Sequence, residues 1–341
     1  MSIEPRISPT IEKMPSDDGR DYVKVSFSGS DTPYACRGAY RIRCADEDVA
    51  MTTEQVRSMM REAIEREDPW DGRVSRRDIS EVDEPTLKAF VERGVAKGRI
   101  PFDHVSVQDT LSRLGLLRDG KLTHAAEVLF CPSRDIQLKM GILATHARTE
   151  ILDLHQESGT LFDLADKASY YILNNTRRRF VLHGDRARDE IPEIPQLAVK
   201  EALMNAYAHR LWPNTDCVMI DIYSDAVEIL SPGWFIDGQD PEEHLAGRST
   251  EAQSRNKLIA AALHRSGDIE SYGTGIPRIR DLCEEAGIRV EYRRVPGGTK
   301  LIFHRNDAFT ATEHDPKMAE DGRRWPKMAR PRSNLFRSKP H

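Results

Sequence analysis

The sequence predicts an α+β protein of two or three domains. Its 341 residues are enough for that number of ordinary cores. Runs that alternate polar and apolar residues, such as 22–28 and 216–224, indicate strands. Runs with apolar residues three or four positions apart, such as 84–97 and 161–174, indicate amphipathic helices.

Composition excludes several classes of protein. No stretch approaches the ~18 to 20 apolar residues of a membrane span, and the N-terminus has no basic start with an apolar run behind it. We therefore expect a cytoplasmic protein with no membrane partner. The net charge of −5 gives no global attraction for nucleic acid. The five cysteines lack any C-x-x-C pair, which argues against a disulfide framework or a zinc site; they are Cys36, Cys44, Cys131, Cys217 and Cys283.

Residues 1–66 form the first predicted segment. Its first 20 residues are rich in Pro and Asp, so we expect partial disorder there. Residues 22–28 and 39–43 are predicted to be two strands of a small sheet, and Thr52 begins a capped helix that runs to about Glu67. Two strands and one helix cannot bury a core alone, so this unit either docks on something or is the remnant of a larger domain.

Residues 67–135 form a connector. It begins with a basic, turn-rich stretch, and two helices follow over 84–97 and 106–114, with Ser106 as the expected N-cap. Asp119 and Gly120 between apolar flanks predict a tight hairpin over 116–123. Helix, helix, hairpin and helix is the outline of a winged helix-turn-helix.

A false motif lies in the connector. Residues 115–122 read G-x-x-x-x-G-K-L, one residue short of a phosphate-binding P-loop. Leu122 stands where Ser or Thr should ligate magnesium, and a helix rather than a buried strand precedes the loop. We therefore reject the P-loop interpretation.

Residues 136–305 form the third segment, and residues 306–341 are predicted to be a disordered basic tail. The segment is predicted to hold a strand over 139–145, extended chain over 177–183, a hairpin over 216–230 and a final strand pair over 289–304. Its predicted helices are 161–174, a helix centred on 200–210, 256–264 and 277–286.

The helix at 200–210 carries a polar line. Glu201, Asn205 and His209 stand at i, i+4 and i+8, while Val199, Leu203, Ala206 and Tyr207 lie on the apolar side with Met204 at its edge. Such polar groups cost stability if they are buried without partners, so they face either water or a ligand.

Three glycine signals follow this helix: Ser231-Pro-Gly233, Gly273-Thr-Gly275 and Gly297-Gly-Thr299. The middle one leads into a helix with Pro277 in its first turn. Backbone N–H groups and a positive helix end can therefore surround an anion there.

These motifs resemble the ATP-binding domain of the GHKL ATPases (gyrase, heat-shock chaperone, histidine kinase and mismatch-repair proteins), in the divergent form found in RecG-like proteins and predicted transcriptional regulators. The likeness rests on 201–210, 229–233, 247–249, 255–256, 269–276 and 297–299. Upstream, residues 22–60 resemble the last part of a Schlafen-type AlbA domain, and residues 86–130 resemble the winged-helix region of the same proteins. The resemblance implies a two-layer α/β sandwich of the GHKL (Bergerat) type over 136–305.

The resemblance also implies roles for individual residues. Asn205 would ligate Mg²⁺, and Glu201 would orient or deprotonate the attacking water. Gly273 and Gly275 would let the backbone approach the phosphates of ATP, and Thr299 would close the adenine end. The other residues expected to bind the nucleotide are Ser231, Gly233, Thr274 and Gly298. Arg210 and Arg278 either reach phosphate or are surface charges.

Two departures from the family pattern matter. Ser231 replaces the Asp that normally reads the adenine amino group, which puts adenine selection in doubt. The strands and acidic residues that open a Schlafen-type domain have no counterpart before Tyr22, so no nuclease activity is implied.

The resemblance therefore implies an ATP-binding, DNA-associated transcriptional regulator with slow or no hydrolysis. The alternative is a DNA-binding regulator whose GHKL-like domain is a structural relic. The candidates for phosphate contact on the connector are Arg93, Lys97, Arg113 and Lys121. A P-loop helicase and a histidine kinase are set aside. A homo-oligomer is possible, with dimerisation expected only from the resemblance.

Overall fold

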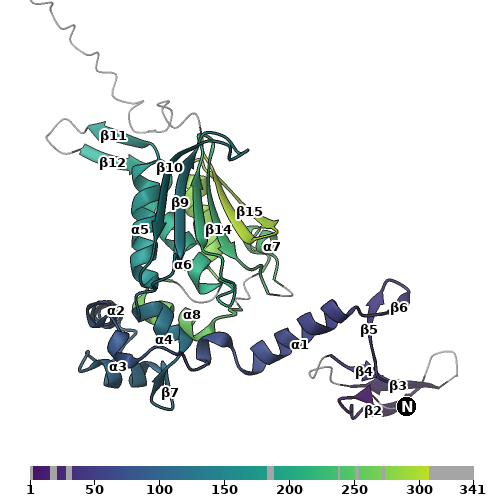
Figure 1. Cartoon of the computed structure of the whole chain (residues 1–341). Helices are drawn as coiled ribbons and strands as arrows, with labels where there is room; N and C mark the ends of the chain where they lie inside the picture. Colours follow the sequence, from purple (N-terminus) through teal and green to yellow (C-terminus); the bar gives the residue numbers. More distant parts are fainter. Residues whose placement is uncertain are drawn as a thin grey trace, which may run out of the picture. The chain divides into compact units, whose positions relative to one another are not determined.

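A computed structural model gives the structure of residues 3–15, 21–27, 33–182, 188–236, 239–249, 253–269 and 273–306. Helices and strands are mixed along the chain (Figure 1), which confirms the α+β class. The predicted basic tail lies outside the described residues, except for Asn306.

The described residues of the N-terminal part form six short strands and one helix. Their bounds are β1 Ile3–Glu4, β2 Thr10–Met14, β3 Tyr22–Ser26, β4 Ala35–Cys36, β5 Ala39–Cys44, β6 Glu47–Ala50 and α1 Thr53–Glu67. The predicted capping box of α1 is present, because Thr52 accepts from Gln55 N and the Gln55 side chain accepts from Thr52 N. The prediction that 22–28 and 39–43 share a sheet is wrong: β3 pairs with β2, whereas β5 pairs with β4 and β6. Alternation identifies a strand but not its neighbour.

The connector has the predicted order of helix, helix, hairpin and helix. Its elements are the 3-10 turns η1 Trp70–Gly72 and η2 Ile79–Glu81, α2 Glu84–Ala96, α3 Val107–Leu114, β7 Leu117–Arg118, β8 Lys121–Leu122 and α4 His124–Phe130. Ser106 caps α3 as predicted, by accepting from Asp109 N. Asp119 and Gly120 have φ of 53° and 74°, the pair of positive values that a type I′ hairpin turn requires. Since this glycine-containing stretch is a hairpin after a helix, it cannot act as a P-loop.

The C-terminal part is built on a six-stranded sheet of order β10-β9-β13-β14-β16-β15. β9 and β13 are parallel, and every other neighbouring pair is antiparallel. Helices α5, α6 and α9 pack on one face and make two layers with the sheet. The strands are β9 Leu138–Leu143, β10 Ile151–Glu157, β13 Val218–Ile222, β14 Ala226–Pro232, β15 Arg289–Val295 and β16 Gly298–His304, and a separate hairpin consists of β11 Arg178–Leu182 and β12 Arg188–Pro192.

The helices of this part are α5 Leu161–Asn174, α6 Gln196–Ala208, α7 Pro241–Leu245, α8 Lys257–Ser266 and α9 Gly275–Glu285. The polar-line helix, α6, begins after Pro195 and ends before His209, which is its C-cap. The prediction that the helix reaches Arg210 is therefore wrong. Val199, Leu203 and Tyr207 are buried as predicted, and Met204, predicted at the edge of the apolar side, is buried too. Ala206 is half-buried: it packs against the core, as predicted, and also lines a cavity.

One continuous hydrophobic core joins the connector to the sheet layer. The rings of Phe90 in α2, Phe130 in α4 and Phe162 in α5 lie 5.2 to 6.1 Å apart. The same cluster extends through Leu203 of α6 to Phe303 of β16. Each Å² of apolar surface buried stabilises the fold by about 25 cal/mol. Burial of these side chains therefore holds α6 and α8 in place beside the connector.

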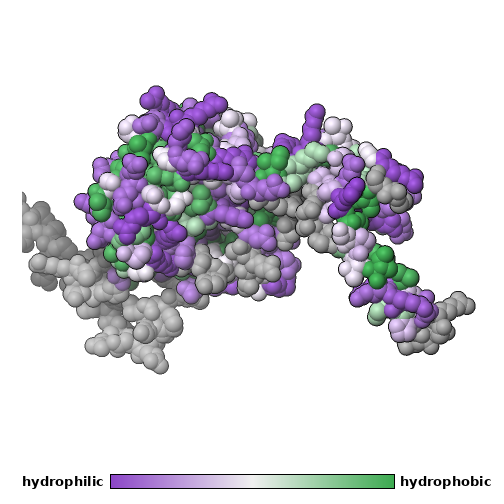
Figure 2. Space-filling model, turned by 90° about the horizontal axis from the view of Figure 1, so that it is seen from below, coloured by the Kyte–Doolittle hydropathy of each residue, from purple (hydrophilic) through white to green (hydrophobic). Residues whose placement is uncertain are grey.

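No helix in the described part of the chain is long and apolar enough to cross a membrane. One face of the molecule shows hydrophilic residues broken by small hydrophobic patches (Figure 2).

Candidate functional site

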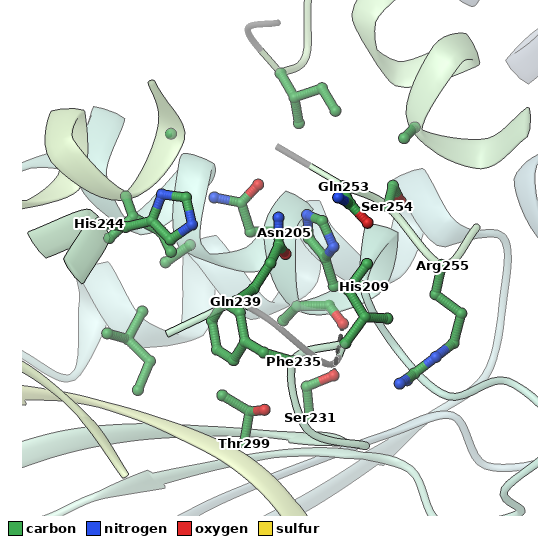
Figure 3. A pocket seen from close by; sticks show the side chains of 18 of the residues that line it. Asn205, His209, Ser231, Phe235, Gln239, His244, Gln253, Ser254, Arg255 and Thr299 are labelled. Atoms are coloured by element: carbon green, nitrogen blue, oxygen red, sulfur yellow. Dashed lines mark hydrogen bonds between the residues drawn. The ribbon is translucent and has the colours of Figure 1, made fainter. Parts of the chain in front are cut away.

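A cavity of about 400 Å³ opens between α6 and the sheet. Its walls come from α6, the end of β14, the 233–236 stretch, residues 253–255, α8, the start of α9 and β16. Figure 3 shows Asn205 and His209 beside the cavity on the α6 side, with Ser231 and Thr299 on the sheet side.

The polar pair of α6 faces the cavity. Glu201 is only 4% exposed, and its Oε1 accepts a 3.4 Å hydrogen bond from Asn205 Nδ2. The 3.6-residue period puts these side chains one above the other, while Leu203 and Tyr207 point into the core. All three residues of the predicted polar line border the cavity, although His209 lies just past the end of α6.

The first turn of α9 packs against this pair. A Cβ on Gly275 would lie 2.6 Å from Glu201 Oε1 and 3.0 Å from Asn205 Nδ2, so glycine alone fits here without a shift. Gly273 has φ of 68°, and Thr274 is the N-cap of α9. The free N–H groups at the start of a helix favour anions. The structure thus brings together a helix start, a carboxylate and a carboxamide.

On the sheet side of the cavity, two hydroxyl groups donate hydrogen bonds that join neighbouring segments. Ser231 Oγ donates to Ala206 O at 2.6 Å, which ties β14 to α6, and Thr299 Oγ1 donates to Gly233 O at 2.7 Å. A Cβ on Gly298 would lie 2.1 Å from Ser231 O, so this glycine permits the close approach of the two strands. Gly298 therefore shapes the site without lining it.

Seven of the nine residues predicted from the sequence line the cavity: Glu201, Asn205, Ser231, Gly233, Gly273, Gly275 and Thr299. Thr274 and Gly298 do not, although both are next to residues that do. Arg210 is directed elsewhere. It is 1% exposed, donates to Gln137 Oε1 at 2.6 Å and to Asp216 O at 2.6 Å, and lies 4.3 Å from the ring of Trp212.

Sequence reasoning missed a basic and aromatic side of the cavity. It is formed by Trp234, Phe235, His244, Arg255 and His264. Arg255 Nη2 donates to Trp234 O at 3.1 Å. Arg255 lies in one of the stretches that carry the family resemblance, but the sequence assigned it no role. The other four lie in segments without a recognisable motif, so only the tertiary fold reveals them.

His209 carries a distinctive charge state. Its imidazole is exposed to the cavity, yet the surrounding protein desolvates it and the charges of Arg255 and His244 oppose its protonation, which lowers its pKa to about 4. At neutral pH the ring is uncharged and offers one donor and one acceptor. It can therefore donate one hydrogen bond and accept another from a ligand, and it adds no positive charge of its own.

The oxygen atoms of Glu201 and Asn205 suit a hard cation. Within the described residues no group of three His, Cys, Asp or Glu side chains could hold a metal ion. A magnesium ion with few protein ligands commonly takes the rest from phosphates and water. The two oxygen donors thus fit an ion that takes its remaining ligands from phosphate and water.

Three comparisons relate this chain to known proteins. Residues 216–300 match the family described as "Putative ATP-dependent DNA helicase recG C-terminal". A comparison with curated proteins found none that matches. The crystal structure of the DIP2311 protein from Corynebacterium diphtheriae is similar, with a TM-score of 0.59 and 18% sequence identity; the match covers 87% of this chain and 59% of that one. At this identity the likeness shows the fold alone, and the chain spans 59% of the length of that protein.

Proposed function

We propose that the cavity binds a nucleoside triphosphate, ATP by preference, together with Mg²⁺. The observation that carries the proposal is the packing of Gly275, at the start of α9, against Glu201 and Asn205. Backbone N–H groups for phosphate and oxygens for a cation lie side by side there. The match of residues 216–300 to a family whose description names an ATP-dependent protein supports the same class of ligand.

Asn205 and Glu201 would hold the cation through their side-chain oxygens. The bound Mg²⁺ would neutralise part of the phosphate charge. Glu201 can also accept a proton from a water molecule. Gly275 packs closely against the Glu201 carboxylate, so this side chain has little freedom to turn towards a water and act as a base. We therefore propose slow or no hydrolysis.

Ser231 can serve the base end despite the loss of the usual carboxylate. Its hydroxyl proton is committed to Ala206 O, so towards a ligand the oxygen can act only as an acceptor. An adenine amino group donates, and a guanine carbonyl does not. We therefore expect ATP to bind more tightly than GTP, and Ser231→Ala to reduce that preference; equal affinities in the wild type would rule out this role.

One titration tests the nucleotide proposal. The affinity for ATP is measured by calorimetry with Mg²⁺ and with EDTA, for the wild type, Asn205→Ala and the control Gln196→Ala. Gln196 is an exposed amide at the start of the same helix and does not line the cavity. Asn205→Ala should weaken binding at least about tenfold with Mg²⁺, the loss of one charge-assisted contact of about 1.4 kcal/mol or more, and should have little effect in EDTA.

Two results would refute the proposal. One is no binding by the wild type at millimolar Mg-ATP, which would favour the relic alternative. The other is equal affinity of wild type and Asn205→Ala in Mg²⁺, which would move the cation away from this helix.

We further propose weak DNA association through the connector. Of the four predicted cations, Arg93 pairs with Asp268 at 3.1 Å and Arg113 lies over the Phe102 ring at 3.9 Å. Lys97 and Lys121 are exposed and form no ion pair within the described residues, so they remain the better candidates. Affinity for a DNA duplex should fall as salt rises, and less steeply in Lys97→Ala/Lys121→Ala. A salt-independent affinity would contradict this part of the proposal.

A further inference from the structure

The two edges of the six-stranded sheet differ in character. The edge strand β15 carries charged side chains at four of its positions: Arg289, Glu291, Arg293 and Arg294. Charged edges are a common protection against pairing with another chain. The opposite edge strand, β10, carries fewer charges, with Asp153 in its first half and Glu157 at its end, and its register with β9 shifts between Ile151 and Asp153.

β10 instead exposes large apolar side chains. Ile151, Leu152 and Leu154 are 53%, 61% and 53% exposed. Within the described residues β10 pairs only with β9, so its outer backbone groups face no strand. An open edge that is also apolar is a template for an additional strand.

The sequence of β10 is complementary to itself in one antiparallel register. If a two-fold axis passes through Leu154, Asp153 of each copy lies opposite His155 of the other, and the two Leu154 side chains meet. A shift of two residues in one direction places Asp153 opposite Asp153. A shift in the other direction places Asp153 opposite Glu157. Like charges directly opposite destabilise a strand pair, so the first of these three registers is the favourable one.

The helix layer supports the same geometry. Asp153 and His155 already lie on the α5 side, where Tyr171 Oη donates to Asp153 Oδ2 at 2.8 Å and His155 Nε2 is 3.1 Å from Asp153 Oδ2. Tyr170, on the neighbouring flank of α5, is 74% exposed. A two-fold axis perpendicular to the sheet would keep both helix layers on one face.

We propose that the partner of this edge is a second copy of the chain. Two β10 strands pair around Leu154, join the two sheets into one, and leave the charged β15 edges outermost. Because this contact is isologous, it closes at the dimer. The cavity stays open, since β9 and β13 separate β10 from β14. The dimer therefore does not depend on the proposed nucleotide site.

The first test is the mass of the whole chain by sedimentation equilibrium between 1 and 100 µM without nucleotide. We expect a dimer, and Leu154→Arg should raise its Kd at least about tenfold, since it places two cations at the axis. The control is Leu197→Arg, at an equally exposed leucine (54%) on α6, which should leave the dimer unchanged. A monomer at 100 µM, or equal weakening by both variants, would overturn the proposal.

Two further variants fix the register. In a background with Cys36→Ser and Cys44→Ser, Leu154→Cys should form an intermolecular disulfide. Residues directly opposite in an antiparallel pair have Cα atoms about 4.5 to 5.5 Å apart, which a disulfide spans. His155→Asp should weaken the dimer about fivefold or more, and Asp153→His/His155→Asp should restore it. Crosslinking no faster than that of Leu197→Cys, or no rescue by the double variant, would exclude this register.

Discussion

At the scale of single residues, the site depends on positions where a side chain is absent. Gly275 leaves room for Glu201 and Asn205 beside the start of α9, and Gly298 lets β16 approach Ser231. The sequence shows these glycines, but it does not show the close contacts that require them. Gly298 was assigned to cofactor binding, yet its neighbours are backbone atoms of β14.

Gly275→Ala should separate stability from binding. Gly275 is the first residue of α9 and has no positive φ, so alanine suits its backbone and favours the helix by up to about 1 kcal/mol. Its Cβ would nevertheless displace Glu201 and Asn205. We expect the free energy of unfolding to change by less than about 1 kcal/mol, while affinity for Mg-ATP falls at least about tenfold, or about 1.4 kcal/mol.

The control for this prediction is Gly72→Ala, whose Cβ would meet only Leu258 at an ordinary 3.8 Å. Urea unfolding and calorimetry report the two quantities. Unchanged nucleotide affinity in Gly275→Ala would show that the packing at α9 does not matter for binding.

At the scale of elements, local chemistry predicted those with strong signals. The Asp119-Gly120 turn, the Ser106 cap and the Thr52 capping box were all read from sequence, because each depends on neighbours within four residues. Several strands were missed, among them β1 and β2, which lie in the stretch expected to be partly disordered. In β10 and β12, Asp153, His155 and Glu190 interrupt any clear alternation. The order of strands in the sheet depends on contacts distant in sequence, and no local pattern encodes it.

The helix α8 depends on a carboxylate from the connector. Asp71 is 1% exposed, and its Oδ2 accepts from Leu258 N at 2.6 Å and Ile259 N at 3.1 Å. Asp71→Ala should lower the free energy of unfolding by about 2 kcal/mol, because two buried amides lose their acceptor. The exposed cap Asp78, which accepts from Ser80 N, is the control: Asp78→Ala should cost less than about 1 kcal/mol.

Burial raises the pKa of Asp71, so the native state binds its proton more tightly than the unfolded chain does. The ionised carboxylate therefore lowers the free energy of unfolding, and this loss grows as pH rises through the raised pKa of Asp71. Asp71→Asn removes this cost and keeps an acceptor, so urea unfolding at pH 7 should show a smaller loss than for Asp71→Ala. Equal losses would show that the negative charge itself is needed.

At the scale of the whole molecule, a buried cluster of ion pairs joins segments of the C-terminal part that are distant in sequence. Glu193 is fully buried and is contacted by Arg177 Nη2 at 2.6 Å and Arg305 Nη2 at 2.9 Å. Arg305 follows the last strand, and the other two residues flank the β11–β12 hairpin. Burial opposes ionisation of Glu193, but the hydrogen bonds from Arg177 and Arg305 outweigh it, and the pKa of Glu193 is lowered.

A lowered native pKa contributes stability above the unfolded value and loses it as pH falls through the native value. Glu193→Gln should therefore reduce the free energy of unfolding at pH 7 by about 3 kcal/mol, since two guanidinium groups lose their counter-ion. The difference from the wild type should shrink as pH falls from 5 towards 3. The control Glu190→Gln removes the carboxylate of an exposed pair with Arg178, and should cost less than about 1 kcal/mol at any pH.

Hydrogen bonds made by two side chains connect the start of α8 to the connector and to the end of α6. Asp71 holds the first amides of α8, and Asn256, just before α8, donates from Nδ2 to Ala208 O at 2.9 Å and Arg210 O at 2.8 Å at the end of α6. Asn256 thus links the last turn of α6 to α8, and Asp71 of the connector holds the first turn of α8. In hydrogen–deuterium exchange, these two turns should open together, and a ligand bound beside Asn205 would slow exchange as far away as Trp70.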